Sequence, residues 1–360
     1  MSEDVQIPAW SIRVGSTQVA GNLLTHSQHI HYEEAIGGKA NVFEVQVEDS
    51  AHAWANNPPK IGTALSLSIG YKGQSLVSCG LFEVDEWESE GPPDTFVIRA
   101  IQAGVTHAIR TPKSVAYENQ SLISIANTVA GQYGMSVNSD AVSPDVSYQR
   151  LTQRLETDLG FLHRIANAHN YEFTIRGNQL VFYSRPKLDA KTIKSLTDKS
   201  AQYIYKTDST RFRIHQQHHG DRCYKKAVVM YFDPLSKKLL QATANAASTA
   251  TQSADLGLND TLLVRERAEN AQQATLKAQS HLHAANMHVL KAEIIIPGTM
   301  VYRAGNPVVL YGFGTALDSI NWIIKEAKHR LDRNGYKTSL ELRTTITGAA
   351  TQFASDDYGE

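Results

Sequence analysis

One short segment of the chain carries several side chains that could bind a metal ion. His215, His218 and His219 precede Asp221 and Cys223, and imidazole, carboxylate and thiolate groups are all zinc ligands. Structural zinc sites usually draw on two separated pairs of ligands, and the sequence offers only His281 with His283 as a second pair. A single cluster of this kind is more typical of a polar loop or strand edge. We therefore predict no metal site and no cofactor, with zinc binding by His215, His218, His219 and Cys223 as the alternative.

A second group of residues could do acid chemistry. Asp85, Glu86, Glu88 and Glu90 lie just before a turn at residues 91–94. Paired carboxylates hydrolyse glycosidic bonds when burial keeps one of them protonated. On consecutive residues of a hairpin, a solvated rim is the ordinary outcome, so hydrolysis is the weaker hypothesis.

Other catalytic signals are missing from the sequence. It contains no glycine-rich phosphate loop, nucleophile elbow or zinc-protease motif. His163 and His169 lie on or beside a predicted helix and are interpreted as structural or exposed. We predict no catalytic residue.

The charges argue against nucleic acid and membrane partners. The chain has 35 basic and 36 acidic residues, a net charge of −1, so no global basic field attracts nucleic acid or an anionic membrane. Arg211, Arg213, Arg222, Lys225 and Lys226 form a local basic stretch, interpreted as a solvated or subunit-facing surface. No apolar run approaches the roughly 20 residues of a membrane helix, and the N-terminus lacks the pattern of a secretory signal.

Length and cysteine content set the domain organisation and the compartment. The 360 residues, 42% of them hydrophobic, favour two or three domains with real cores. Cys79 and Cys223 are the only cysteines, so no disulfide framework holds the fold and a reducing cytoplasm is the expected place of folding.

Most of the chain shows strand patterns. Residues 1–112 contain short alternating runs separated by turns, which predicts a small barrel or sandwich. A second strand-rich region starts near Tyr203 and ends with a hairpin at Asn334-Gly335. Within this second region, residues 241–253 are interpreted as a mobile excursion. Residues 265–287 are predicted to form a helix with a narrow stripe of small side chains, able to approach a sheet or a neighbouring subunit closely.

The middle of the chain predicts a helix-and-hairpin module. Leu159, Leu162 and Ile165 recur at helical spacing, with Thr157 or Asp158 as the cap and Asn170 as a left-handed exit. Two alternating runs follow, joined by a turn at residues 177–178. An upstream helix around residues 122–129, ended by Gly134, begins a similar unit.

These motifs resemble those of a known family. The segment from Leu155 to Ala166, followed by residues 171–173 and 180–182, resembles the signature of the phage late control protein D family. That family includes the baseplate hubs of contractile tails and the N-terminal part of VgrG spikes. This chain departs from the family's usual pattern at two positions: it has Gly160 where the family has an acidic residue, and Asn170 where the family has a glycine. Landmarks at residues 58–62, 70–71, 80–82, 91–94, 304–314, 322, 329 and 331–342 extend the resemblance over nearly the whole chain.

The resemblance implies a fold and an assembly. The fold is mainly β with an α+β insert: a first barrel at 1–112, the module at 113–190, a second barrel with the helix 265–287 at 191–345, and a flexible tail at 346–360. The protein is then a structural, non-enzymatic baseplate hub, assembled in the bacterial cytoplasm into a virion tail or tail-like particle.

The resemblance also implies the partners. A homotrimer presents six similar barrels and adapts a hexameric tail tube to a trimeric spike. The expected partners are the spike, the tube, other baseplate proteins and, as a further candidate, the tape measure protein, without nucleic acid or membrane. We expect the small-residue helix and one edge of each barrel to form the interfaces. The alternatives are a tail-associated cell-wall hydrolase or wall-binding module, and a truncated VgrG-like secretion spike.

Overall fold

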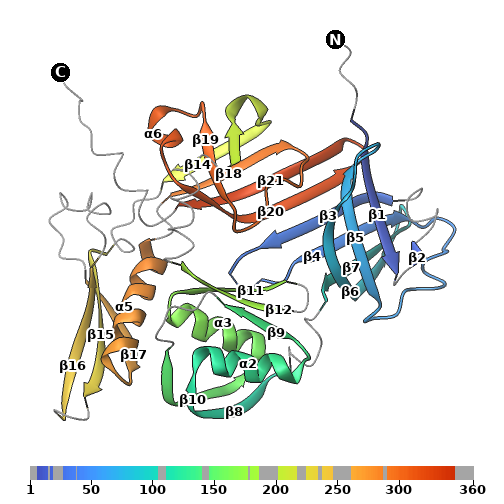
Figure 1. Ribbon diagram of the computed structural model, residues 1–360. Coiled ribbons are helices and arrows are strands. Elements are labelled where there is room, and N and C mark those ends of the chain that lie inside the picture. Colours follow the sequence, from blue (N-terminus) through green and yellow to red (C-terminus); the bar gives the residue numbers. More distant parts are fainter. Residues whose placement is uncertain are drawn as a thin grey trace, which may run out of the picture.

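Strands from both ends of the chain join edge to edge in one large sheet (Figure 1). The computed structural model describes residues 6–14, 17–18, 27–37, 39–103, 111–139, 146–176, 179–185, 202–216, 224–233, 237–245, 261–286 and 290–344. The sheet has 13 strands. Its N-terminal half is β1 (Pro8–Val14), β2 (Thr17–Gln18), β3 (Ser27–Ala35), β4 (Val42–Glu48), β5 (Ala64–Tyr71), β6 (Val77–Glu90) and β7 (Thr95–Gln102). Its C-terminal half is β13 (Gln202–Tyr205), β14 (Arg211–Gln216), β18 (Leu290–Pro297), β19 (Pro307–Tyr311), β20 (Trp322–Asp332) and β21 (Gly335–Thr344).

Strand β20 makes the joint between the two halves. One of its edges pairs with β21 along its whole length. On the other edge, Trp322 and Ile323 pair with β19, whereas Glu326 to Asp332 pair with β3. A register shift between Ile324 and Glu326 accompanies this change of partner, as expected of a bulge that redirects a strand.

The mainly β class is confirmed, but the two closed barrels are not. Among the described residues the strand pairings run continuously from β14 to β2 and close neither half. The physical reason is β20, which continues past β19 and pairs its remaining length with β3 instead of leaving two separate sheets. Each half still has its own core, one around Phe43, Leu67 and Phe82 and the other around Ile294, Trp322 and Leu342.

The helix-and-hairpin module forms as the sequence predicts. It contains β8 (Lys113–Ser121), α2 (Leu122–Gln132), β9 (Ser136–Ser139), β10 (Ser147–Glu156), α3 (Asp158–Ala168), β11 (Tyr171–Arg176) and β12 (Gln179–Ser184). The helix faces of Ile125 and Leu162 pack with Phe173 and Phe182 in one buried cluster. Each helix is followed by a strand that pairs with β12, which confirms the two similar units. The predicted turn at residues 177–178 lies outside the described residues.

Both ends of α3 follow the predicted capping. The Thr157 hydroxyl accepts a hydrogen bond from the backbone N–H of Gly160 at 3.0 Å, so Thr157 is the N-cap. Asn170 follows the helix with φ of 64°, the left-handed conformation that asparagine and glycine tolerate.

The conformation of Asn170 leads to a stability prediction. Asn170→Gly is expected to keep the melting temperature within a few degrees, whereas Asn170→Val should cost about 1–2 kcal/mol because a β-branched residue is strained at positive φ. Thermal unfolding of the two variants beside the wild type measures the difference. Equal melting temperatures for both would contradict the backbone argument.

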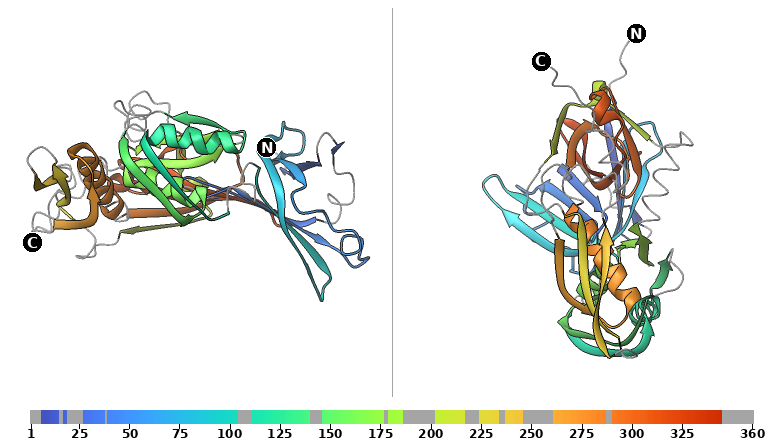
Figure 2. Two further views of the ribbon diagram at one scale, coloured as in Figure 1. Left: turned by 90° about the horizontal axis from the view of Figure 1, so that it is seen from below. Right: turned by 90° about the vertical axis from the view of Figure 1, so that its left-hand side faces the viewer.

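A third unit lies at one end of the elongated molecule, opposite the N-terminal strands (Figure 2). Strands β15 (Lys226–Asp233), β16 (Lys238–Asn245) and β17 (Thr261–Ala268) form a separate three-stranded sheet, covered by α5 (Ala271–Asn286).

The predicted limits of this region were partly wrong. Residues 265–268 belong to β17 and not to the helix, because Asn270 caps α5 by accepting a hydrogen bond from the N–H of Gln273. Residues 241–245 belong to β16 and not to an excursion, because they pair along β15. The rest of that predicted excursion, and the predicted tail at 346–360, lie outside the described residues.

The small-residue stripe of α5 packs within its own chain. Ala274, Ala278 and Leu282 are buried against Ala227 and Val229 of β15. The stripe therefore approaches a sheet of its own chain, the first of the two contacts that the sequence allowed for it. Small side chains are needed here because they let the helix approach the three-stranded sheet closely.

Candidate functional site

The candidate metal ligands do not form a site among the described residues. His215 is exposed on β14, while residues 218, 219, 221 and 223 lie outside the described part of the chain. His283 is buried on α5 and its neighbour His281 is half-buried. Within the described ranges, no group of three or more His, Cys, Asp or Glu side chains converges.

The candidate carboxylates are exposed or half-buried. Glu86 and Glu90 are exposed on β6, and Asp85 and Glu88 are half-buried. Glu88 and Glu86 lie 3.1 and 3.5 Å from Nη1 of Arg99. An ion-paired carboxylate at the surface lacks the desolvation that a general acid needs.

The candidate histidines of the module are part of its packing. His169 is buried with its ring edge-on to Tyr148, and burial lowers its pKa to about 3. His163 lies 2.7 Å from the Asn167 amide, and burial lowers its pKa as well. In the predicted basic stretch, Arg211 and Arg213 are exposed on β14.

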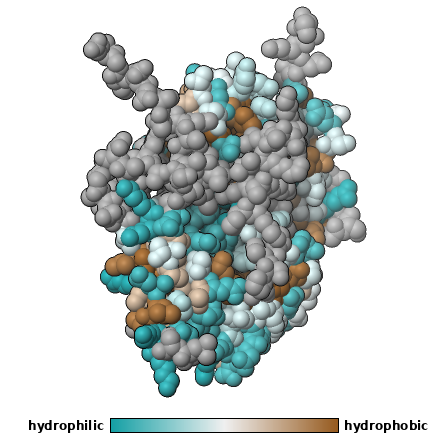
Figure 3. Space-filling model, turned by 60° about the vertical axis from the view of Figure 1, so that its left-hand side comes forward, coloured by the Kyte–Doolittle hydropathy of each residue, from teal (hydrophilic) through white to brown (hydrophobic). Residues whose placement is uncertain are grey.

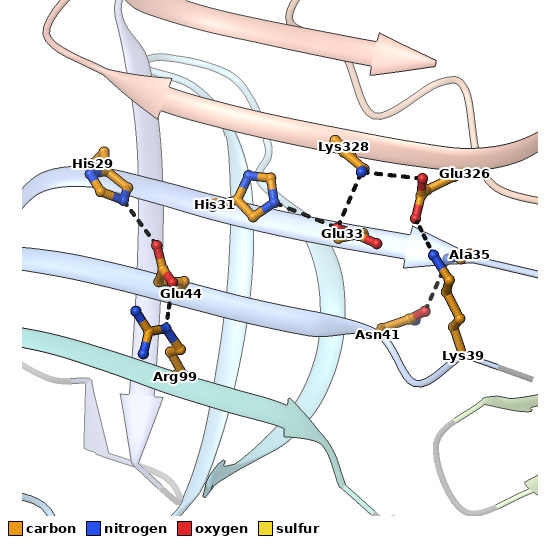
Figure 4. A network of polar contacts seen from close by, with 10 residues as sticks. All are labelled: His29, His31, Glu33, Ala35, Lys39, Asn41, Glu44, Arg99, Glu326 and Lys328. Carbon is orange, nitrogen blue, oxygen red and sulfur yellow. Dashed lines mark hydrogen bonds and ion pairs between the residues drawn. The ribbon is translucent and has the colours of Figure 1, made fainter. Parts of the chain in front are cut away.

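A polar network crosses the joint of the large sheet (Figure 4). The Glu44 carboxylate on β4 accepts from Nε of Arg99 at 2.8 Å and lies 3.2 Å from Nε2 of His29. On the far side of β3, Nζ of Lys328 lies 3.6 Å from Glu33 and 3.2 Å from Glu326. The network therefore ties together β7, β4, β3 and β20.

The pKa values of Glu33 and Glu326, the two acidic residues at the joint, are shifted in opposite directions. The hydrogen bond with Glu326 raises the pKa of Glu33. Burial alone would raise the pKa of Glu326, but hydrogen bonds with Glu33, Lys39 and Lys328 outweigh it and lower this pKa to about 2. The Lys39 ammonium lies 3.2 Å from the same carboxylate. This arrangement fixes the two half-sheets relative to each other on a face that remains in contact with water.

Aromatic side chains gather where the C-terminal half of the sheet ends. We call Tyr203, Tyr205, Phe212, Tyr311 and Phe313 the aromatic edge. The Tyr205 and Tyr311 rings meet at 5.4 Å, and the Phe212 and Phe313 rings at 5.1 Å. Tyr311 is 60% exposed. Among the described pairings, β13 and β14 each have one partner strand, so both also offer an open edge here.

The outer face of the three-stranded sheet is a second apolar surface. Met230, Phe232, Leu239 and Leu263 point away from α5 and are exposed. Figure 3 brings this side of the molecule forward and shows apolar side chains in patches among polar ones. Surfaces of this composition are typical of protein contacts.

Sequence reasoning missed both surfaces. The aromatic residues of β13 and β14 read as ordinary strand residues, because alternation does not tell which strands end a sheet. The signal that could have revealed the aromatic surface is the presence of three aromatic residues, Tyr203, Tyr205 and Phe212, close together on either side of a short connection.

Comparison with known proteins places this fold. No family model matches the chain. The chain is 22% identical over 377 residues to the probable baseplate hub protein of Escherichia phage P2, covering 97% of this chain and 96% of that protein. It is 21% identical over 382 residues to the probable baseplate hub protein of Escherichia phage 186, covering 97% of this chain and 96% of that protein.

Solved structures show the same architecture. The 43 kDa tail protein of prophage MuSo2 from Shewanella oneidensis superposes with a TM-score of 0.68 at 15% identity, covering 95% of this chain and 99% of that one. The tail protein from Neisseria meningitidis MC58 gives 0.65 at 13% identity, covering 96% and 99%. A chain of the Francisella PdpA-VgrG complex gives 0.58 at 8% identity, covering 99% of this chain and 60% of that one.

The fold is thus that of phage tail proteins, shared with VgrG. The chain is similar along nearly its whole length to the probable baseplate hub proteins of phages P2 and 186, and we identify it as a baseplate hub protein of a contractile phage tail. It is a component of the virion tail baseplate. Its relatives are structural proteins, so its role is structural, as the sequence motifs indicated. Among the described residues, no helix is both long and apolar enough to cross a membrane.

Proposed function

We propose that three copies of this chain form a ring that adapts a hexameric tail tube to a trimeric spike. The observation that carries the proposal is the division of the large sheet into two halves of similar size, each with its own core. Three chains therefore present six such halves. A closed ring also satisfies head-to-tail contacts without an open filament.

The two halves are proposed to take the places of the two barrel-type domains, at 1–112 and 191–345, with the module at 113–190 between them. Their separate cores support this division. The polar network at the joint is then proposed to face water in the assembled ring, because its side chains are ion-paired and most of them are partly exposed.

The aromatic edge is the proposed contact between subunits. Exposed tyrosine and phenylalanine side chains bury large areas at low entropic cost and are enriched at interface centres. Here they stand beside the open edges of β13 and β14, which can also donate and accept backbone hydrogen bonds. This retains the expectation of an edge contact and replaces the small-residue helix.

Removing two tyrosines from the aromatic edge should dissociate the ring. Tyr205→Ser with Tyr311→Ser is expected to weaken assembly by at least about 2 kcal/mol, roughly 30-fold, because both side chains are large and exposed. Size-exclusion chromatography across a concentration series measures the shift to monomer. Ile61→Ser, which removes an apolar side chain as exposed as Tyr311 from the turn before β5, is the control. Unchanged assembly of the double variant would exclude this edge.

The spike, the tail tube and other baseplate proteins, with the tape measure protein as a further candidate, are the proposed partners. The Francisella structure supports a hub-like chain within a larger complex. Co-expression with the candidate spike, followed by affinity capture of the spike, should recover this chain. The role is proposed to involve no catalysis, so a peptidoglycan zymogram should show no clearing. Clearing would favour the hydrolase alternative.

A further inference from the structure

Strand β15, the middle strand of the three-stranded sheet, carries apolar side chains on both of its faces. Ala227 and Val229 are buried on the side that α5 covers (Figure 1), whereas Val228, Met230 and Phe232 point the other way. A sheet with one wet face normally alternates apolar with polar residues, and a continuous apolar strand is typical of a sheet that is covered on both sides. The composition of β15 therefore predicts a second cover on the outer face.

The apolar residues of this outer face form one band across all three strands. Leu239 of β16 lies directly opposite Phe232, and Leu263 of β17 lies directly opposite Val228. Met230 lies between these two pairs on β15, and every member except Val228 is at least 36% exposed. Together they expose a few hundred Å² of apolar surface, in the range of the patches that mark binding sites. We call these five residues the apolar band.

The charges beside the apolar band are all positive. Lys226 lies on β15 two positions before the band, and Arg265 follows Leu263 by two positions on β17, so both point to the outer face. Both are exposed, and neither forms an ion pair within the described part of the chain. Glu266 faces the other side, where its carboxylate lies 3.6 Å from Nζ of Lys277 on α5. The other polar residues of the outer face are uncharged: Gln241, Thr243, Asn245 and Thr261.

The size and charge of this face select among possible covers. A stable interface between two proteins buries about 800 Å² on each partner, which exceeds the area of the apolar band, so a second copy of the chain fits poorly. Two cations are also fewer than the basic cluster that holds a protein on an anionic lipid surface. The opposite face of the same sheet accepts a single helix, α5. One helix of matching polarity is therefore the cover that the outer face suits.

We infer that the outer face of this sheet binds an amphipathic helix of a partner protein, with carboxylates along the border of its apolar stripe. The stripe packs on the apolar band, and the carboxylates lie beside Lys226 and Arg265. The bound helix and α5 then cover the two faces of one sheet, a common layered arrangement. The contact needs only one chain, so the inference does not depend on the trimer.

Fluorescence anisotropy with a labelled helical peptide, stabilised by a hydrocarbon staple, tests binding to the full chain. The sequence Trp-Leu-Glu-Ala-Leu-Leu-Glu-Glu-Leu-Glu-Ala-Leu-Leu-Glu-Glu-Leu places leucine on one face of the helix and glutamate along both borders. We expect saturable binding that weakens as salt is raised. The same peptide with lysine in place of glutamate should bind at least about tenfold more weakly.

Two substitutions test the apolar band and its charged border separately. Leu239→Gln should weaken binding by about tenfold or more, because it interrupts the band. Its matched control is Leu81→Gln on β6, a strand leucine of similar exposure, which should change affinity less than about twofold. Arg265→Glu should also weaken binding by about tenfold, whereas Arg211→Glu, at another exposed strand arginine, should leave it within about twofold.

Methionine methyl spectra locate the peptide without a substitution. Met230 belongs to the apolar band, whereas Met135 and Met300 are buried in the module and in the N-terminal half of the large sheet. The methyl signal of Met230 should shift during titration with the peptide, and the signals of Met135 and Met300 should stay in place.

Several results would overturn the inference. They are absence of binding, equal binding of the lysine peptide, unchanged affinity of Leu239→Gln, and a Met230 signal that does not move. A solution mass that falls in Leu239→Gln would assign the face to a second copy of the chain instead. Binding to phosphatidylglycerol vesicles that is lost in Leu239→Gln would assign it to a lipid surface.

Discussion

Replacing Glu172 with glutamine is expected to lower the free energy of unfolding by about 3–5 kcal/mol, the range for breaking a buried ion pair from one side. The substitution preserves the shape of the side chain but leaves Arg185 and Arg343 buried without a carboxylate. Their desolvation is then only partly compensated, by hydrogen bonds such as those from Nη2 of Arg185 to Oδ1 of Asn167 and from Nη1 of Arg343 to the Thr344 carbonyl. Chemical denaturation, followed by far-ultraviolet circular dichroism, gives the difference in unfolding free energy.

Two variants bracket this result. Glu118→Gln breaks an exposed pair with Arg150 and should cost less than about 1 kcal/mol. Replacing the whole arrangement by Glu172→Leu, Arg185→Met and Arg343→Met should recover much of the loss, because no charge then remains buried there. A loss below 1 kcal/mol for Glu172→Gln would show that the three side chains are hydrated in solution.

Lowering the pH from about 7 to about 5 is expected to remove about 6 kcal/mol of stability through three buried histidines. Burial lowers the pKa of His169 and of His329 to about 3, and that of His283 to about 2. The unfolded chain takes up protons near pH 6.5, where the folded chain does not. Stability is therefore fully present above that pH and falls as the pH drops, by about 2 kcal/mol per histidine at pH 5.

The histidine contribution can be separated from that of the carboxylates. Glu326, Glu44 and Glu156 have lowered pKa values, so their ion pairs weaken only as the pH falls below about 4.5. His283→Leu removes one titrating group and should reduce the loss between pH 7 and pH 5 by about 2 kcal/mol. Melting temperatures measured across this range for both proteins give the comparison. An identical pH dependence would show that His283 is protonated in the folded protein.

Local features of the fold could be predicted from the sequence where nearby residues determine them. The helix at Leu159 and Leu162, its cap at Thr157, the exit at Asn170 and the hairpin before Gly335 all follow from spacing and turn chemistry. The start of α5 was misplaced because arginine and glutamate in residues 265–268 read as helix, whereas pairing with β15 holds them in a strand. Tertiary pairing overrides propensity in such a case.

The joint and a cavity could not be predicted in this way. The pairing of β3 with β20 joins residues about 300 positions apart, and it depends on where β19 stops along β20. The cavity between the large sheet, the module and α5 likewise assembles ion-paired side chains from separate units, namely Lys39, Arg164, Arg185, Lys325 and Arg343. Their convergence is a product of the fold and leaves no motif in the sequence.

The solution mass of the purified protein, measured by light scattering alone and with its candidate spike, tests the trimeric hub most directly. The account predicts about 119 kDa for the protein alone, three times the chain mass of 39.7 kDa. A monomer that becomes a trimer only with the spike would show that the spike templates the ring. A mass of one chain, 39.7 kDa, alone and no trimer with the spike would contradict the trimeric hub.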